Sequence, residues 1–103
     1  MAKVRRTRRI PFKTLEEVAP VLKVLAHPHR LRIVEVLLRE PVSVAELAAE
    51  VKLAPAAVSQ HLSQMRANGI LKSCRRGKQV YYEVINRNAA NLISCIIENG
   101  AGR

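Results

Sequence analysis

The sequence predicts a mainly α-helical domain with one small β-hairpin, in the order of four helices, two strands and a final helix. Apolar residues recur at helical spacing through most of the chain, and β-prone residues replace them only between residues 70 and 85. Aromatic content is 3%, with no Trp, so the core must be built from aliphatic residues, which suits packed helices. At 103 residues the chain fits one domain.

Residues 1–13 are strongly basic. They hold six of the 18 Lys and Arg residues and no acidic residue. Because like charges repel and this segment offers little to bury, we expect a flexible N-terminal arm that Pro11 ends. The folded unit follows over residues 14–99. The arginines of the arm that can contact an anionic partner are Arg5, Arg6, Arg8 and Arg9.

The first two helices are predicted over residues 15–26 and 28–39. Thr14 and Glu17 have the spacing of a capping box, in which each side chain accepts a hydrogen bond from the other residue's backbone N–H. Pro28 suits the first turn of the second helix, where its missing N–H removes no helical hydrogen bond. The apolar residues at helical spacing are Leu15, Val18, Leu22 and Leu25, then Leu31, Ile33, Val34, Leu37 and Leu38.

Two further helices joined by a tight turn are predicted next. Ser43 and Glu46 form a second capping box, which opens a short helix. Pro55 fits the first turn of a helix over residues 55–68, and Gly69 stops it by permitting a left-handed backbone. This pair has the helix-turn-helix arrangement.

The pattern changes after Gly69. Residues 70–75 and 79–85 are β-prone runs, and Arg76-Gly77-Lys78 separates them as a turn. A last helix, ended by Gly100, follows with an apolar stripe of Ala89, Leu92, Ile93, Ile96 and Ile97. The fold class is therefore a winged helix-turn-helix, mainly α with a small hairpin as the wing.

The formal net charge of +10 indicates an anionic partner, either nucleic acid or a membrane surface. No run of about 18 apolar residues exists, and no apolar segment follows the charged start as a secretory signal requires. We therefore expect a cytoplasmic protein that binds double-stranded DNA and no membrane.

Residues 55–64 have the composition of a helix that lies in the DNA major groove. Such a helix needs small residues near the phosphate backbone and hydrogen-bonding side chains outward, because base edges are distinguished by donors and acceptors. An ordinary solvated polar face is the alternative. The preceding turn and the following hairpin favour DNA. The candidate contacts are Ala56, Ala57, Ser59, Gln60, His61 and Gln64.

The hairpin tip is basic and carries few acids. Positive side chains beside a groove bind phosphate oxygens, which gives affinity more than sequence preference. A solvated surface cluster with no binding role is the alternative. The candidate contacts are Arg75, Arg76, Lys78 and Gln79.

The order of elements and several short sequence motifs resemble those of the ArsR/SmtB family of winged-helix repressors over residues 15–98. The motifs are Leu25-Ala26-His27-Pro28-His29-Arg30-Leu31-Arg32-Ile33, Val44-Ala45-Glu46-Leu47-Ala48, Ser59-Gln60-His61-Leu62, and Gly69-Ile70-Leu71 through Arg76-Gly77-Lys78-Gln79-Val80-Tyr81-Tyr82. The resemblance implies a homodimeric repressor in which Ser59, Gln60 and His61 face DNA. It also implies that the first and last helices pair across a two-fold axis, through Leu15, Val18, Leu22, Leu92, Ile93 and Ile96.

Members of this family often sense metals, but the ligands are missing here. The arsenic and cadmium type has C-V-C-D-L where this chain has Ser43, Val44, Ala45, Glu46 and Leu47, so both thiolates are absent. The zinc type has four metal ligands on its last helix. This chain has Asn86, Asn88, Asn99 and Gly102 at those positions, so all four ligands are absent. We predict no metal at either site and no cofactor, and the sequence leaves the existence and nature of an inducer open.

The three histidines are expected to serve structure or DNA binding. His27 and His29 flank Pro28 at a helix start, while His61 belongs to the DNA-facing helix. Zinc requires three or four convergent ligands, and nothing in the sequence indicates that these three converge.

Cys74 and Cys95 are candidate redox residues. Some relatives sense oxidants or electrophiles through cysteine pairs, and Cys74 lies beside Arg75 and Arg76, which favour a thiolate. Packing is the stronger explanation, because cysteine in an apolar helix commonly acts as a small hydrophobe.

Two other functions stay open. A non-specific nucleic-acid-binding protein would depend on the basic arm alone and show steep salt dependence. A winged-helix protein-interaction module is also compatible with the fold, although the polar residues at Ser59, Gln60 and His61 argue against it. An enzyme is not expected, because the chain has no Gly-rich phosphate loop and its eight acids are scattered.

Overall fold

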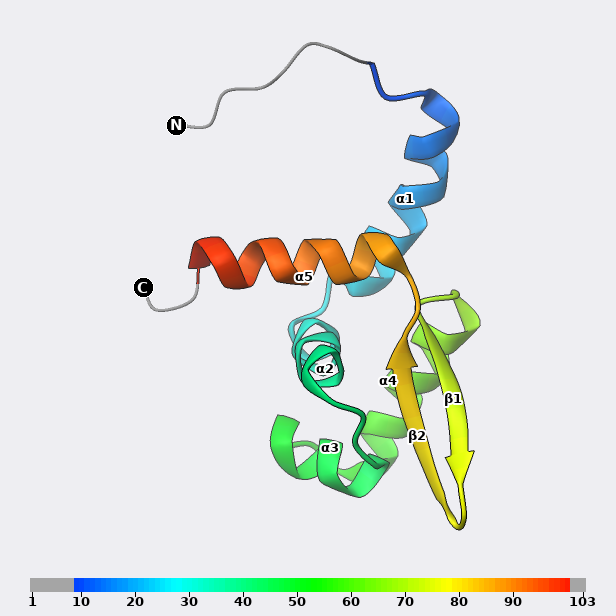
Figure 1. The fold of residues 1–103 in the computed structure, drawn as a ribbon, viewed down its shortest axis with the longest axis vertical. Helices are drawn as coiled ribbons and strands as arrows, with labels where there is room; N and C mark the ends of the chain where they lie inside the picture. The colour runs from blue at the N-terminus through cyan, green and yellow to red at the C-terminus, as the bar shows by residue number, and fades with distance from the viewer. Residues whose placement is uncertain (1–8, 101–103) are drawn as a thin grey trace.

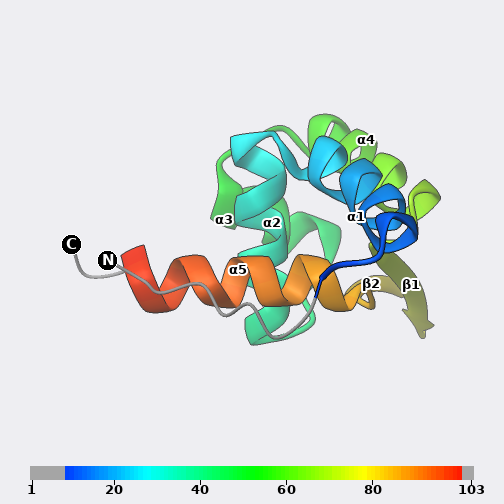
Figure 2. The same cartoon turned by 90° about the horizontal axis from the view of Figure 1, so that it is seen from above.

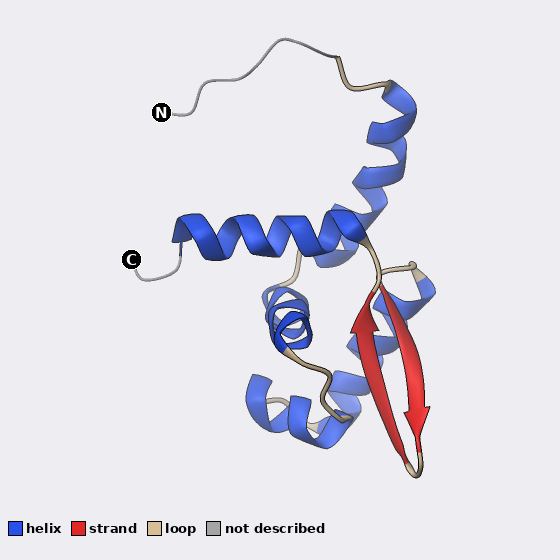
Figure 3. Cartoon of the chain, viewed as in Figure 1, coloured by secondary structure: helices blue, strands red, loops and turns tan. Residues whose placement is uncertain are grey.

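The computed structural model describes residues 9–100 and has the expected order of elements (Figures 1 and 3). Five helices surround an aliphatic core, and one antiparallel hairpin lies against them. The winged helix-turn-helix prediction is confirmed. The elements are α1 (Phe12–Leu25), α2 (Pro28–Arg39), α3 (Val44–Val51), α4 (Pro55–Ala67), β1 (Leu71–Arg76), β2 (Gln79–Val84) and α5 (Arg87–Gly100).

The core lies around α2, which packs against α1, α3, α5 and β2. Ile33 and Val34 of α2 are completely buried, as are Leu62 and Met65 of α4. Each such side chain contributes about 1.5–3 kcal/mol through removal from water. Figures 1 and 2 show α5 crossing over α2, and Figure 1 shows α3 and the hairpin tip at the end of the long axis away from α1.

Helix α1 begins three residues earlier than the sequence predicts. Its N-cap is Pro11, whose carbonyl accepts a hydrogen bond from the Thr14 N–H at 2.9 Å. No side chain caps this helix, so the expected capping box of Thr14 and Glu17 is wrong. Because the helix already starts at Phe12, Thr14 lies within the first turn and cannot serve as the N-cap.

The bounds of α2 match the sequence prediction, and the capping box that opens α3 is confirmed. The Ser43 hydroxyl accepts from the Glu46 N–H, and the Glu46 carboxylate accepts from the Ser43 N–H at 2.9 Å. Lys52 then adopts a left-handed backbone, with φ of 60°, and turns the chain toward α4. These local bonds fix where the helix-turn-helix begins and how sharply it turns.

Helix α4 ends in the motif that Gly69 predicts. The Gly69 N–H donates to Arg66 and the Ile70 N–H donates to Met65 at 2.9 Å, while Gly69 has φ of +73°. This is a Schellman motif, and the buried side chains of Met65 and Ile70 supply its hydrophobic contact. The motif directs the chain from α4 straight into the hairpin.

The hairpin pairs Leu71 with Val84 at its base and Arg76 with Gln79 at its tip. Its strands are one residue shorter at the base than predicted, and β1 continues through Arg76, so the turn is only Gly77 and Lys78. Gly77 has φ of +63°, as the first central residue of a type II′ turn requires. None of the helices in residues 9–100 is long and apolar enough to cross a membrane.

Candidate nucleic-acid interface

Helix α4 has one buried face and one exposed polar face. Val58, Leu62 and Met65 are completely buried. Four of the sequence candidates are exposed, and Ala57 is half-buried. The helix therefore presents donors and acceptors to solvent from a rigid base, as readout of base edges requires. The exposed candidates are Ala56, Ser59, Gln60 and Gln64.

Sequence reasoning missed two exposed polar residues of α4, Ser63 and Arg66. Ser63 lies four residues after Ser59, which places the two hydroxyls on one face of the helix. That spacing was the available signal. A guanidinium at position 66 adds positive charge in the last turn of the same helix.

The hairpin tip is a solvent-exposed basic surface. Arg75, Arg76, Lys78 and Gln79 are all exposed. The Arg76 guanidinium lies over the ring of Tyr81, 5.7 Å from its centroid, which orients it by a cation–π contact. Near the base of the hairpin, Lys72 forms an ion pair with Glu83 at 3.4 Å, so the charge of Lys72 is partly neutralised.

The hairpin is attached to the helix-turn-helix at two points. Strand β1 packs against α4, and a single β-bridge joins Ser43, just before α3, to Tyr81 of β2. The basic tip is thereby held in a fixed relation to the exposed face of α4.

His61 differs from the other α4 candidates because its ring packs inward. It is half-buried, and its centroid lies 4.7 Å from that of His27 in an edge-on contact. Arg30 Nε donates a hydrogen bond to His61 Nδ1 at 3.1 Å. Burial lowers the pKa of His61, and the charges of His27, Arg30 and His29 lower it further.

Arg30 links three helices at this point. Besides its bond to His61, its Nη1 donates to the carbonyl of Val24 near the end of α1 at 3.1 Å. A single side chain from the start of α2 therefore connects α1 to α4. This contact fixes the orientation of the helix that carries the polar face.

The expectation that the histidines do not converge is wrong. One ring nitrogen from each of His27, His29 and His61 lies within 4.8 Å of the other two. The tight turn between α1 and α2 and the docking of α4 bring together residues that are 34 positions apart. No sequence periodicity could have indicated this, because the contact depends on tertiary packing.

Of the predicted N-terminal arm, residues 1–13, the structure describes only residues 9–13. Arg9 is exposed. Arg5, Arg6 and Arg8 lie outside the described residues, so their contacts with DNA stay a prediction.

The residues expected to pair two chains divide into exposed and buried sets. Leu15, Leu22 and Ile96 are 45%, 45% and 47% exposed, whereas Val18 and Leu92 are half-buried. Ile93 is only 3% exposed, because it fills the chain's own core.

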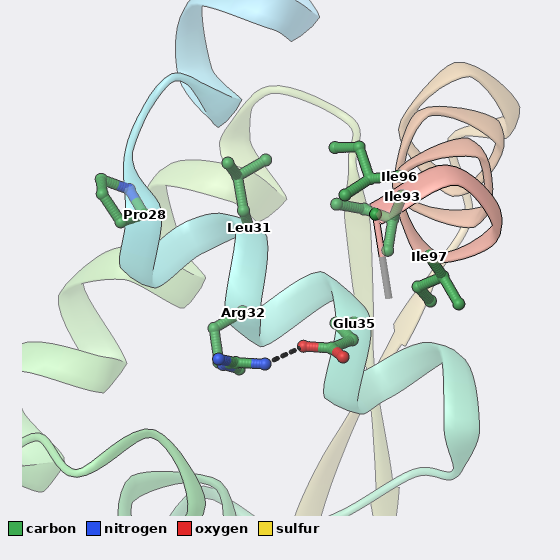
Figure 4. Close-up of a pocket in the computed structure, with 8 residues that line it drawn as sticks. Pro28, Leu31, Arg32, Glu35, Ile93, Ile96 and Ile97 are labelled. Carbon is green, nitrogen blue, oxygen red and sulfur yellow. Dashed lines mark hydrogen bonds and ion pairs between the residues drawn. The ribbon is translucent and has the colours of Figure 1, made fainter. Parts of the chain in front are cut away.

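Two large apolar side chains that the sequence analysis did not select are exposed near this surface, Phe12 at 71% and Ile97 at 41%. Figure 4 shows Ile96 and Ile97 of α5 facing Leu31 of α2 across an open pocket of about 420 Å³. The exposed apolar surface thus continues from α5 toward the start of α2.

Both cysteines are free thiols on the surface. Cys74 lies opposite Tyr81 in the hairpin, and Cys95 Sγ accepts a hydrogen bond from Asn99 Nδ2 at 3.4 Å. Neither thiol is therefore packed in the core of the single chain. The two sulfurs form no disulfide.

A rigid helix with an exposed polar face, docked beside a basic hairpin, defines the winged helix-turn-helix class of DNA-binding transcriptional regulators. Comparison with known proteins agrees. The family model described as bacterial regulatory protein, arsR family, matches residues 27–73. The chain belongs to the ArsR family of transcriptional regulators.

Relatives with this family's architecture cover nearly the whole chain. The transcriptional repressor PagR of Bacillus anthracis is 36% identical over 85% of this chain and 89% of its own. The structure of the repressor BigR from Xylella fastidiosa matches with a TM-score of 0.81 at 33% identity, over 89% of this chain and 94% of BigR. Reduced HlyU from Vibrio cholerae matches with a TM-score of 0.82 at 27% identity, over 87% and 95% of the two chains.

Proposed function

We propose that this protein is a homodimeric repressor that places α4 of each chain in the major groove of one half of an imperfect palindrome. The observation that carries the proposal is the division of α4 into a completely buried apolar face and an exposed face bearing Ser59, Gln60 and Gln64. A helix held rigidly by its own core can position hydrogen-bonding groups against base edges. Occupying the site would block access of RNA polymerase to a promoter.

The two exposed surfaces would divide the work of binding. Gln60 and its neighbours supply discrimination between bases, about 1–3 kcal/mol for a good bidentate pair. The hairpin tip supplies affinity through phosphate contacts, because Arg75, Arg76 and Lys78 are exposed cations. The basic arm, with Arg5, Arg6, Arg8 and Arg9, would bind flanking phosphates or the minor groove.

His61 would act differently from the other α4 candidates. Because its Nδ1 accepts from Arg30 and its ring packs on His27, its effect on DNA binding would come through the orientation of α4. Its place in the sequence Ser59-Gln60-His61 is therefore compatible with a role in DNA recognition that involves no base contact.

The exposed apolar side chains of α1 and α5 support a homodimer. Leu15, Leu22 and Ile96 leave large parts of their surfaces in water, and such patches mark association surfaces. A two-fold dimer through this surface would carry two α4 helices, which matches the symmetry of a palindromic site.

We also propose that the protein works in the cytoplasm without catalytic activity. Any inducer would act by binding unequally to two dimer geometries, only one of which matches the half-site spacing.

The proposal is tested with purified protein and the DNA upstream of its own gene, against shuffled DNA of equal length at physiological salt. Selective binding of the upstream DNA, with two chains per site, is the expected result. Equal affinity for both DNAs would favour a non-specific nucleic-acid-binding protein. Binding to neither would favour a protein-interaction module.

A further inference from the structure

The three histidines are the only histidines of the chain, and the fold gathers all of them at one place. His27 caps α2, His29 lies in its first turn, and His61 comes from the middle of α4. One nitrogen of each ring lies within 4.8 Å of the other two. His29 is exposed and the others are half-buried, so the cluster opens to solvent on one side.

Within the described residues, the surroundings of the three rings offer no acidic partner and leave one buried ring nitrogen without a hydrogen bond. Within residues 9–100, no carboxylate forms a hydrogen bond or ion pair with any of the three. His27 Nδ1 is buried and has no hydrogen-bond partner. A buried, unpaired ring nitrogen is unfavourable, so a ligand that bonds to it stabilises the folded chain.

We propose that His27, His29 and His61 form a binding site for one divalent metal ion of the zinc type. Three neutral imidazoles suit Zn²⁺ and Co²⁺ and discriminate against Ca²⁺ and Mg²⁺, which prefer oxygen ligands. This site lies apart from the two metal sites known in the family. At those sites this chain has residues 43–47 and Asn86, Asn88, Asn99 and Gly102, and the family's ligands are absent.

Modest movement completes the site. Tetrahedral zinc with bonds of about 2.0–2.1 Å places neighbouring nitrogens about 3.3 Å apart. Because the ligand nitrogens of any two histidines now lie within 4.8 Å, side-chain rotation must bring each pair closer by about 1.5 Å at most. His29 can supply it for the two pairs that include His29, because its ring is exposed and no hydrogen bond holds it in the described part of the chain.

Arg30 competes with the ion. In a neutral imidazole only one nitrogen has a free lone pair, and Arg30 Nε occupies it on His61 Nδ1. Metal binding requires His61 either to release this bond and present Nδ1, or to move its proton from Nε2 to Nδ1 and present Nε2. Both routes break the Arg30–His61 contact. The nearby guanidinium charge also repels the cation, so Arg30 lowers the affinity of the site.

The test uses the untagged full-length chain in a Cys74→Ser, Cys95→Ser background, so that neither thiols nor tag histidines bind the probe. After treatment with EDTA, Co²⁺ is titrated and its visible absorption is followed, then Zn²⁺ is added as a competitor. We expect one Co²⁺ per chain, displaced by one Zn²⁺. Binding weaker than about 1 mM, or no Co²⁺ spectrum, would overturn the proposal.

Variants place the ion in the cluster. His29→Ala should weaken Zn²⁺ binding at least about tenfold, because loss of even an outer-shell partner typically costs that much. The matched control is Asn88→Ala, an exposed residue of α5 at one of the alternative zinc positions, which should leave affinity unchanged. Equal affinity of His29→Ala and the parent protein would contradict the site.

Arg30→Met gives a result that an adventitious surface histidine would not, because methionine has neither a positive charge nor a hydrogen-bond donor. Removing the competing donor and its charge should raise Zn²⁺ affinity severalfold. In case this variant fails to fold, the ring nitrogen resonances of the parent protein provide a second measurement. Zn²⁺ should shift those of all three histidines together at one equivalent, and a shift of His29 alone would overturn the proposal. None of these measurements uses DNA, so their failure would leave the proposed function standing.

Discussion

Two regions of this molecule differ in how completely one chain covers its apolar residues. Around α2 and α4 the aliphatic side chains are enclosed, and Ile33, Leu62 and Met65 have no exposed surface. Along α1 and α5 the cover is incomplete, since Phe12, Leu22 and Ile96 remain in water although other residues of both helices are buried. The DNA-binding unit is therefore complete within one chain, whereas the α1 and α5 surface needs something to cover it.

This difference separates two requirements that a small regulator must meet. Helix α4, which we propose reads DNA, needs a rigid base, and the core supplies it through α3 and β1. The proposed placing of two α4 helices at a fixed spacing needs a second chain, which the exposed apolar surface can recruit. Substitutions in the two regions should accordingly change different measurements.

The largest effect is expected from Leu62→Ala in the enclosed region. Truncating a completely buried leucine should lower the free energy of unfolding by about 2–5 kcal/mol. Urea denaturation at fixed protein concentration measures it. Gln64→Ala, on the exposed face of the same helix, is the control and should change stability by no more than about 0.5 kcal/mol. Similar losses in both variants would contradict the assignment of the two faces.

Ile96→Lys should act on association instead. A charge placed within the exposed apolar surface should raise the dimer dissociation constant by at least about 30-fold, as loss of an interface hot spot does. Analytical ultracentrifugation over a range of concentrations measures this constant. Asn91→Lys adds the same charge at another exposed position of α5 and should leave it unchanged. A monomeric parent protein would refute the dimer.

Gln60→Ala should reduce discrimination between DNA sequences. We expect specific binding to weaken by about 1–3 kcal/mol, because Gln60 is exposed on α4 and can bond to a base edge. Binding to random DNA should be nearly unchanged. Fluorescence anisotropy with both DNAs measures the difference, and an equal loss for both would remove Gln60 from the base contacts.

Arg76→Ala should weaken binding to both DNAs alike. Its guanidinium is exposed at the hairpin tip, where it can contact phosphate but carries no sequence information. The slope of log affinity against log salt should fall by about 1. A loss confined to the specific DNA would show that Arg76 reads a base.

The smallest effect on stability is expected from Cys74→Ser and Cys95→Ser. Both thiols are exposed, so each variant should change the free energy of unfolding by no more than about 0.5 kcal/mol. Denaturation under reducing conditions measures this. A larger loss would restore the packing explanation. Comparing operator affinity of oxidised parent and variants then tests whether the thiols regulate binding.

Local signals explain how much the sequence could predict. The bounds of α2, the capping box at Ser43 and the roles of Gly69 and Gly77 depend on a few neighbouring residues, and each is confirmed. The predicted start of α1 was wrong because the Pro11 carbonyl accepts the first helical hydrogen bond and no side chain caps the helix, so the sequence carries no capping signal there.

Tertiary packing explains what the sequence could not predict. The cluster of His27, His29 and His61 depends on how α4 docks on the junction of α1 and α2. Likewise, Ile93 and Ile97 belong to one apolar stripe, and only the packing of α5 decides which is buried and which is exposed. A stripe predicts the face of a helix without assigning it to the chain's own core or to a partner.

Selection of bound sequences from a random DNA pool would test the central claim most directly. The account predicts that the parent protein enriches an inverted repeat whose half-sites lie about one helical turn, or a multiple of it, apart. Ile96→Lys should lose the repeat. Enrichment of a single unrepeated site, or of no sequence at all, would contradict a dimer that reads DNA through two α4 helices.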